Sequence, residues 1–143
     1  GERFVAMSVA ENDFGDSRAH TVDGDGTVEN CIVAAARGDD IFVGRGFDVI
    51  KIDVQGFELD VLRGMAGTLE RSPDVVIVSE FWAAGLRERG REPMAVLADL
   101  RALGLRFDVQ TGDNLSSMTD QAIVRHCDAM GRDGQVNLVL RHA

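Results

Sequence analysis

The chain has 143 residues, 45% of them hydrophobic, and a formal net charge of -9. This length and apolar content fit one folded domain with a sizeable core, and they exclude an intrinsically disordered chain. The acidic balance argues against nucleic acid or an anionic membrane surface as the main partner.

The elements expected in chain order begin with strands. Apolar and β-branched runs predict strands at residues 4–9, 17–22, 31–36 and 48–54. The third run could instead form a short helix. Polar turns are expected between the first three strands, at residues 11–15 and 23–26.

After Gly56 the apolar spacing changes from two residues to about 3.6, which is typical of a helix. This helix is expected to end at Ser72, because the residue before Pro73 disfavours α geometry. The later elements are a strand at 74–79, a helix from Pro93 to a cap at Gly104, a strand at 105–109, a helix at about 119–130 and a strand at 136–140. Each helix should bury one apolar face, formed by Leu59, Leu62, Ala66 and Leu69, by Met94, Leu97, Leu100 and Leu103, and by Ile123, Cys127 and Met130.

The alternation of strands and helices predicts an α/β fold with a parallel sheet and right-handed crossovers. Such a sheet needs helices on both faces, but only about two crossover helices are visible in the sequence. One face of the sheet is therefore expected to stay open unless an upstream segment or a partner chain covers it.

The cysteines bear on the cellular compartment. Cys31 and Cys127 are far apart and form no CxxC pair, which favours a reducing compartment and gives no sign of a zinc site. The sequence shows neither an apolar run of about 18 residues nor a signal peptide, and we expect a cytoplasmic protein.

Carboxylates follow two successive strands of the expected sheet. Asp53 lies at the end of one strand, and Glu80 follows the next. Ligands of open α/β sheets bind beyond the carboxyl ends of the strands, so the two side chains should converge on one crevice. There they could bind a cation or accept a proton from a substrate hydroxyl.

Two neighbours of these carboxylates have structural alternatives. Strand alternation places Lys51 on the face of Asp53, and a lysine in a buried strand needs a partner, either Asp53 or Glu58. Lys51 could thus be a purely structural ion pair. Glu58 could simply stabilise a helix N-terminus through the helix dipole.

Residues 49–64, VIKIDVQGFELDVLRG, closely resemble the signature of the FkbM methyltransferases. That signature is a strand ending in IKIDV, then Glu or Gln, Gly, an aromatic or small residue and Glu, with VLxG later. Residues 80–93 resemble the segment after the next strand in one branch of the family, and residues 137–141 resemble its closing strand. Residues 9–15 resemble the polar turn after its third strand.

The resemblance implies a Rossmann-like class I methyltransferase, with a mostly parallel sheet and an antiparallel C-terminal strand. Residues 1–143 would form a single partial domain, from about the third strand to the C-terminus, without the first βαβ portion. The implied reaction is methyl transfer from S-adenosyl-L-methionine to a small-molecule hydroxyl of a sugar or secondary metabolite.

The resemblance also implies roles for particular residues. Asp53 is the best candidate for a general base or acceptor-orienting group, and the other candidate catalytic residues are Lys51, Gln55, Glu58 and Glu80. Gln55 stands where many members have Glu. Phe81 and Trp82 would line the acceptor pocket or pack in the core, and the strand end at Ser8 and Val9 would approach the cofactor. We expect no metal, since two carboxylates are too few ligands to define an ion.

One departure from the family pattern concerns the cofactor. The glycine-rich loop after a first strand is absent, and the only candidate, residues 43–47, leads into a strand and is interpreted as a turn. A non-catalytic interaction module derived from the same fold is therefore the main alternative. A homodimer, or the missing N-terminal half, would then cover the open sheet face.

Other patterns in the sequence have simpler explanations. Residues 23–26, DGDG, lack the distant ligands of a calcium loop and are expected to form a hairpin turn. Arg87, Arg89 and Arg91 could grip an anionic acceptor, although a solvated loop face is the simpler interpretation. An unrelated nucleotide-binding α/β domain is a further alternative, against which the matches around Asp53 argue.

Overall fold

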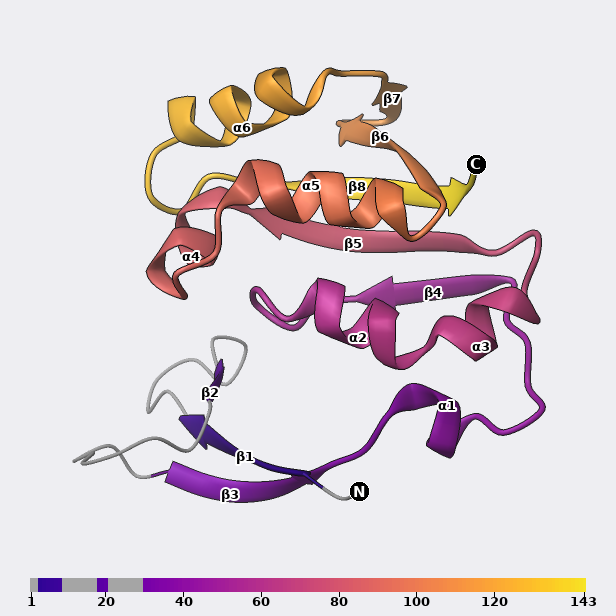
Figure 1. Cartoon of the computed structure of the whole chain (residues 1–143). Helices are drawn as coiled ribbons and strands as arrows, with labels where there is room; N and C mark the ends of the chain where they lie inside the picture. Colours follow the sequence, from indigo (N-terminus) through magenta and orange to yellow (C-terminus); the bar gives the residue numbers. More distant parts are fainter. Residues whose placement is uncertain (1–2, 9–17, 21–29) are drawn as a thin grey trace.

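The computed structural model describes residues 3–8, 18–20 and 30–143 (Figure 1). The turns predicted at residues 11–15 and 23–26 lie outside the described residues, as does Val9. The described residues form two separate sheets, one from the three N-terminal strands and one from the five later strands.

The N-terminal sheet is antiparallel. It consists of β1 (Arg3–Ser8), β2 (Arg18–His20) and β3 (Asn30–Ala35), in the order β2-β1-β3. The three strands were predicted, but their expected place in the same sheet as the later strands is wrong. Fewer than the dozen or so residues that a parallel crossover requires separate β1 from β2, so these two strands pair antiparallel, and β3 pairs antiparallel with the other edge of β1.

The second sheet holds the candidate site. Its strands are β4 (Val49–Ile52), β5 (Val76–Trp82), β6 (Leu105–Thr111), β7 (Asn114–Ser116) and β8 (Gln135–His142), in the order β4-β5-β8-β6-β7. β4 and β5 are parallel, whereas β8 runs antiparallel to both β5 and β6. β4, β5 and β6 therefore point the same way, with β8 inserted between β5 and β6.

The antiparallel C-terminal strand is thus confirmed, but the prediction of a mostly parallel sheet is wrong for the described strand pairs. β4–β5 is the one parallel pair among them, and β7, which was not predicted, adds a further antiparallel neighbour to β6. The physical reason is that β8 places its buried residues Leu138 and Leu140 in the middle of the sheet, where they separate two strands that would otherwise be parallel neighbours.

The helices are shorter than the sequence predicted. They are α1 (Gly38–Ile41), α2 (Glu58–Gly64), α3 (Ala66–Glu70), α4 (Ala83–Glu88), α5 (Pro93–Ala102) and α6 (Asp120–Ala129). The single helix expected after Gly56 is broken at Met65, whose non-helical backbone separates α2 from α3. The break buries Met65 and leaves Ala66 exposed, contrary to the predicted apolar face.

Two further burial predictions are wrong for a shared reason. Leu103 and Met130 are 36% and 48% exposed, because α5 ends at Ala102 and α6 at Ala129. The other residues predicted for these two helix faces are buried or half-buried, and α4 also supplies buried side chains although the sequence did not predict it.

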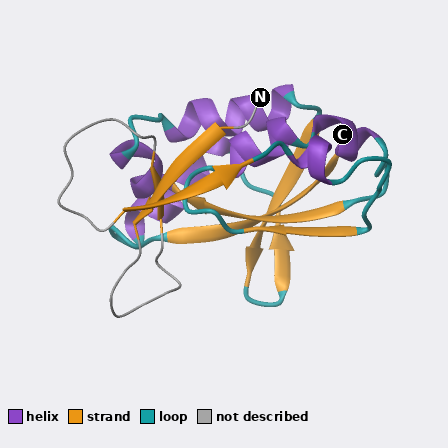
Figure 2. Ribbon diagram, turned by 90° about the horizontal axis from the view of Figure 1, so that it is seen from below, coloured by secondary structure: helices purple, strands orange, loops and turns teal. Residues whose placement is uncertain are grey.

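The helices α2, α5 and α6 lie side by side along one face of the five-stranded sheet (Figures 1 and 2). Strand residues on that face, such as Ile52, Ile77 and Leu140, are buried. Most residues that alternate with them toward the other face are more open: Val49 is 66% exposed and Val78 is half-buried, whereas Val139 is 7% exposed. In the described residues, helices therefore cover one face of the sheet more than the other, as expected from the sequence. The identity of what covers the open face stays a prediction.

Asp39 joins α1 to the start of α3. Its carboxylate accepts hydrogen bonds from the Thr68 amide and hydroxyl at 2.7 and 2.8 Å, and from the Gly67 amide at 3.1 Å. These are free amides of the first turn of α3, which need an acceptor. Partial desolvation acts to raise the pKa of Asp39, but these hydrogen bonds and nearby Arg37 outweigh it and lower that pKa.

We expect the fold to lose stability in acid as Asp39 takes up a proton. Because the pKa of Asp39 is lower in the folded state, its contribution is complete above the ordinary value of 3.8 and is lost as pH falls through the folded value. Asp39→Asn should therefore flatten the acid limb of a plot of melting temperature against pH. Asp40→Asn, at the exposed neighbour, serves as the control, and an unchanged acid limb in Asp39→Asn would contradict the assignment.

Candidate active site

The carboxyl end of β4 lies beside the second half of β5, which continues past it to Trp82. Ile52 pairs with Ser79 in the parallel register, so the chain brings Asp53 and Glu80 to the same edge of the sheet. Glu80 lies within β5 and not after it as predicted, because pairing with β8 extends β5 to Trp82. The strands that lead to Asp53 and Ser79 are nevertheless neighbours, which confirms that part of the prediction, and Asp53 follows the carboxyl end of β4. This end is the position at which open α/β sheets bind ligands.

Gln55 bridges the two carboxylates. Its Nε2 donates to Glu80 Oε2 at 2.9 Å and to Asp53 Oδ1 at 3.2 Å. The backbone of Gln55 is left-handed, with φ of 51°, and no other non-glycine residue of the described chain has a positive φ. Strain of this kind costs of order 1–3 kcal/mol and is concentrated at functional sites.

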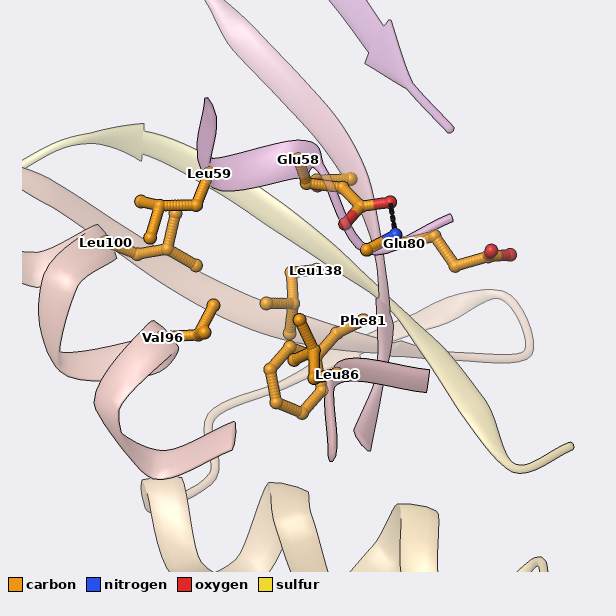
Figure 3. Close-up of a pocket in the computed structure, with 10 residues that line it drawn as sticks. Glu58, Leu59, Glu80, Phe81, Leu86, Val96, Leu100 and Leu138 are labelled. Carbon is orange, nitrogen blue, oxygen red and sulfur yellow. Dashed lines mark hydrogen bonds between the residues drawn. The ribbon is translucent and has the colours of Figure 1, made fainter. Parts of the chain in front are cut away.

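Glu58 holds the turn that carries Gln55. Its Oε1 accepts hydrogen bonds from the Gly56 amide at 3.0 Å and the Val54 amide at 3.3 Å, and the first of these is drawn in Figure 3. Glu58 is also the first residue of α2, so the helix-terminus role that the sequence left open fits its position. We call Asp53, Gln55, Glu58 and Glu80 the carboxylate cluster.

Lys51 lies beside this cluster on the open face of the sheet. Its Nζ is 3.8 Å from Asp53 Oδ2, which confirms the first of the two pairings that the sequence suggested. The expectation that Lys51 is buried is wrong, because the lysine side chain is 57% exposed. An ion pair this open contributes little to stability.

Glu80 has the most perturbed environment in the cluster. Burial raises the pKa of its carboxyl, and the negative charges of Asp53 and Glu58 raise that pKa further. Lys51 and the hydrogen bond from Gln55 act in the opposite direction without cancelling the rise. Glu80 therefore has a raised affinity for a proton, as suits a general base.

A small pocket lies on the helix-covered side of the cluster (Figure 3). Its apolar wall is formed by Leu59, Phe81, Leu86, Val96, Leu100 and Leu138, and Gly56, Glu58, Ser79 and Glu80 complete the lining. The Glu80 carboxylate points away from this apolar wall in Figure 3. Asp53 is not among the lining residues and is exposed at the rim of the sheet.

The two aromatic residues predicted for the acceptor pocket have different surroundings. Phe81 is 3% exposed and contributes to the pocket wall. Trp82 is 7% exposed, donates from its indole to the Arg132 carbonyl at 2.7 Å, and does not line this pocket. For Trp82 the core-packing alternative therefore agrees with the observed contacts.

Three arginines at the end of α4 and just after it have partners that the sequence did not predict. Arg87 forms a two-bond ion pair with Asp128, and Arg91 pairs with Asp60 at 2.6 Å. The Arg89 guanidinium instead lies 4.7 Å from the centre of the Phe57 ring, against the turn that carries Gln55. The spacing of the three arginines was visible in the sequence, but their partners come from other elements.

The described residues form no cradle for a methyl-donating cofactor. Residues 43–47 lead into β4 and do not open a helix, as predicted. Ser8 is the last residue of β1, which belongs to the separate N-terminal sheet. In the same part of the chain, no group of three or more His, Cys, Asp or Glu side chains is arranged to hold a metal ion.

The left-handed backbone of Gln55 yields a stability prediction. Gln55→Gly and Gln55→Ala both remove the bridging amide, but only alanine retains the cost of a left-handed conformation. We expect the glycine variant to be more stable than the alanine variant by about 1 kcal/mol, after the entropic cost of glycine is subtracted. Urea unfolding of both variants measures this difference, and equal stabilities would contradict a strained Gln55.

Comparison with known protein families decides the assignment. The family model described as the methyltransferase FkbM domain matches residues 5–106, which is more than half of the chain. The chain belongs to the FkbM methyltransferase family. Neither the curated proteins nor the solved structures gave a match.

Membership of the FkbM family bears out the resemblance of the motif at residues 49–64. The match contains the whole carboxylate cluster and the arginines after α4, and it ends at the start of β6. Membership of this family excludes the alternative that the chain is an unrelated nucleotide-binding α/β domain. None of the helices in the described residues is long and apolar enough to cross a membrane.

Proposed function

We propose that this FkbM family member is an S-adenosylmethionine-dependent methyltransferase that methylates a hydroxyl group of a small molecule, such as a sugar or secondary metabolite. The observation that carries the proposal is the bridge from Gln55 to Asp53, just after β4, and to Glu80 on the neighbouring parallel strand β5. The bridging residue has a strained backbone and lies inside the family match.

We assign different roles to the two carboxylates. The acceptor hydroxyl must lose its proton as the new bond to the methyl carbon forms, and Glu80 accepts this proton because its surroundings favour the protonated form. Asp53, exposed at the rim, accepts a hydrogen bond from the hydroxyl and orients it. Gln55 fixes both carboxylates, Glu58 fixes the turn, and Lys51 pairs with Asp53.

The finer fold assignment proposed with this function is the Rossmann-like class I arrangement. β4, β5 and β6 point the same way and β8 is inserted against them, which supports it. Together with the spacing of the cysteines, the buried thiol of Cys127 supports a reducing, cytoplasmic location.

The alternative function is a non-catalytic interaction module that uses the open sheet face. The observation in its favour is the one-sided helix cover of the five-stranded sheet. The two functions differ in the contacts they need, because an interaction module requires neither the Gln55 bridge nor the proton affinity of Glu80.

Isotope-labelled S-adenosylmethionine provides the test. The purified protein is incubated with the labelled cofactor and a panel of sugars, phenols and aliphatic alcohols, and mass spectrometry follows methyl transfer. Calorimetry measures binding of the cofactor alone. We expect heat of binding and an oxygen-methylated product. Absence of both at millimolar cofactor, together with self-association in sedimentation equilibrium, would favour the interaction module.

A further inference from the structure

The segment after α4 is held in one conformation by its own backbone. The Arg91 amide donates to the Leu86 carbonyl and the Gly90 amide donates to the Arg87 carbonyl, both at 2.9 Å. Gly90 has a φ of +69°, so these bonds form the Schellman arrangement that ends many helices. Arg89 and Arg91 therefore leave α4 from fixed positions.

Both arginines reach the turn of the carboxylate cluster. The Arg89 and Arg91 guanidinium carbons lie 4.7 and 5.9 Å from the centre of the Phe57 ring, within the range of cation–π attraction. Arg91 is also paired with Asp60 on α2 at 2.6 Å. The end of α4 is thus fastened to the start of α2 through one aromatic ring and one ion pair.

Arg89 also packs against the backbone of the turn. A Cβ atom added to Gly56 would lie 2.8 Å from Arg89 Nε and 3.0 Å from Arg89 Cδ, so the side chain occupies space that only glycine leaves free. Gly56 has a φ of +97° and follows the left-handed Gln55 directly. Arg89 therefore covers the backbone whose shape places the Gln55 amide between Asp53 and Glu80.

We propose that Arg89 is a positioning residue that holds the turn at residues 54–57 in the shape required by the carboxylate cluster. It acts through Gly56 and Phe57 and does not contact the acceptor. The catalytic meaning of this role rests on the proposed methyltransferase function, whereas the mechanical role does not. Arg87, two residues earlier and inside α4, is the matched control because its side chain pairs with Asp128 on α6.

The first experiment measures the turn directly and needs neither cofactor nor acceptor. Amide hydrogen exchange of Val54 and Gly56, both donors to Glu58, is followed by NMR in the wild-type protein, Arg89→Ala and Arg87→Ala. Loss of the Arg89 contact should speed exchange at both amides roughly three- to five-fold, as expected for one cation–π contact. Arg87→Ala should leave both rates unchanged. Unchanged rates in Arg89→Ala, or equal acceleration in Arg87→Ala, would overturn the proposal.

The second experiment separates positioning from the electrostatic effect of a nearby positive charge. Lysine at position 89 keeps the charge but loses the flat guanidinium that stacks on Phe57. If Arg89 positions Gln55, the NMR titration of the Glu80 side chain should shift upward in Arg89→Lys as well as in Arg89→Ala, because the hydrogen bond from Gln55 lowers the pKa of Glu80. A titration that moves only in Arg89→Ala would show a charge effect and would overturn the positioning role.

The results of these two NMR experiments can be distinguished from the result of the methyl-transfer assay. If methyl transfer is never observed but both NMR results hold, Arg89 does position the turn and the assigned chemistry is wrong. If methyl transfer is established and the NMR results fail, Arg89 is not its positioning residue. When both hold, Arg89→Lys should lower kcat more than it changes KM, because the acceptor itself is not touched.

Discussion

Replacement of Glu80 by glutamine is expected to lower the rate of methyl transfer by roughly 10²–10⁴-fold, the usual effect of losing a general base. Glutamine keeps an oxygen that can accept the hydrogen bond from Gln55, so the shape of the cluster can persist while the proton acceptor is lost. In the wild-type protein the rate should rise as pH rises through the pKa of Glu80, which burial and the charges of Asp53 and Glu58 raise above its ordinary value of 4.5. This limb of the pH–rate profile should disappear in Glu80→Gln.

The same substitution should not weaken the fold. A carboxyl with a raised pKa stabilises the folded state while it is protonated, and this contribution is lost as pH rises through the folded pKa. Glutamine stays neutral, so at neutral pH the variant should be at least as stable as the wild type. Asp108→Asn, at a half-buried carboxylate on β6, is the matched control and should retain activity. Activity of Glu80→Gln within about threefold of the wild type would refute the role, since a lost base costs far more.

Replacement of Ile77 by alanine is expected to destabilise the protein by about 2–5 kcal/mol. Ile77 is 0% exposed and lies on the helix-covered face of β5, between Ile50 of β4 and Leu140 of β8. Its removal leaves a cavity between the central strands and the helices, and both the lost apolar burial and the cavity carry a cost. Urea unfolding measures the change through the midpoint and slope.

Val49→Ala is the control for this core prediction. Val49 lies on β4 in the same sheet but faces the open side and is 66% exposed, so its truncation should change the free energy of unfolding by less than about 0.5 kcal/mol. Ile77→Val, which removes one methyl group, should fall between the two at about 0.5–1.5 kcal/mol. Equal costs for Ile77→Ala and Val49→Ala would mean that the two faces of the sheet are equally buried.

The sequence predicted that these polar residues lie together because most of them are close together along the chain. Strand alternation and the change of period at Gly56 placed Asp53, Gln55 and Glu58 around one strand-to-helix turn. Glu80 could be added because sequential parallel strands end at the same edge of a sheet. The Gln55 bridge was not predictable, because it depends on a left-handed backbone that local propensity does not specify for glutamine.

The partners of Arg89 and Lys51 show where local patterns fail. Three arginines at alternate positions resemble a solvated loop, yet the helix end at Gly90 directs Arg89 and Arg91 onto Phe57, more than thirty residues earlier in the chain. Lys51 was expected in a buried strand because its neighbours are β-branched, but its face of the sheet has little helix cover. Burial depends on what packs against a strand, which the strand itself does not encode.

The sequence by itself determined the types of the longer elements, the family and the position of Asp53 after β4, because these follow from local periodicity and from a motif contained within sixteen residues. Tertiary structure alone decided that the first three strands form a separate antiparallel sheet and that β8 separates β5 from β6. It also decided which face the helices cover and which arginine touches the turn. These features depend on contacts between segments that are distant in the sequence. Such contacts form, and contribute to the free energy of folding, only when the whole chain packs together.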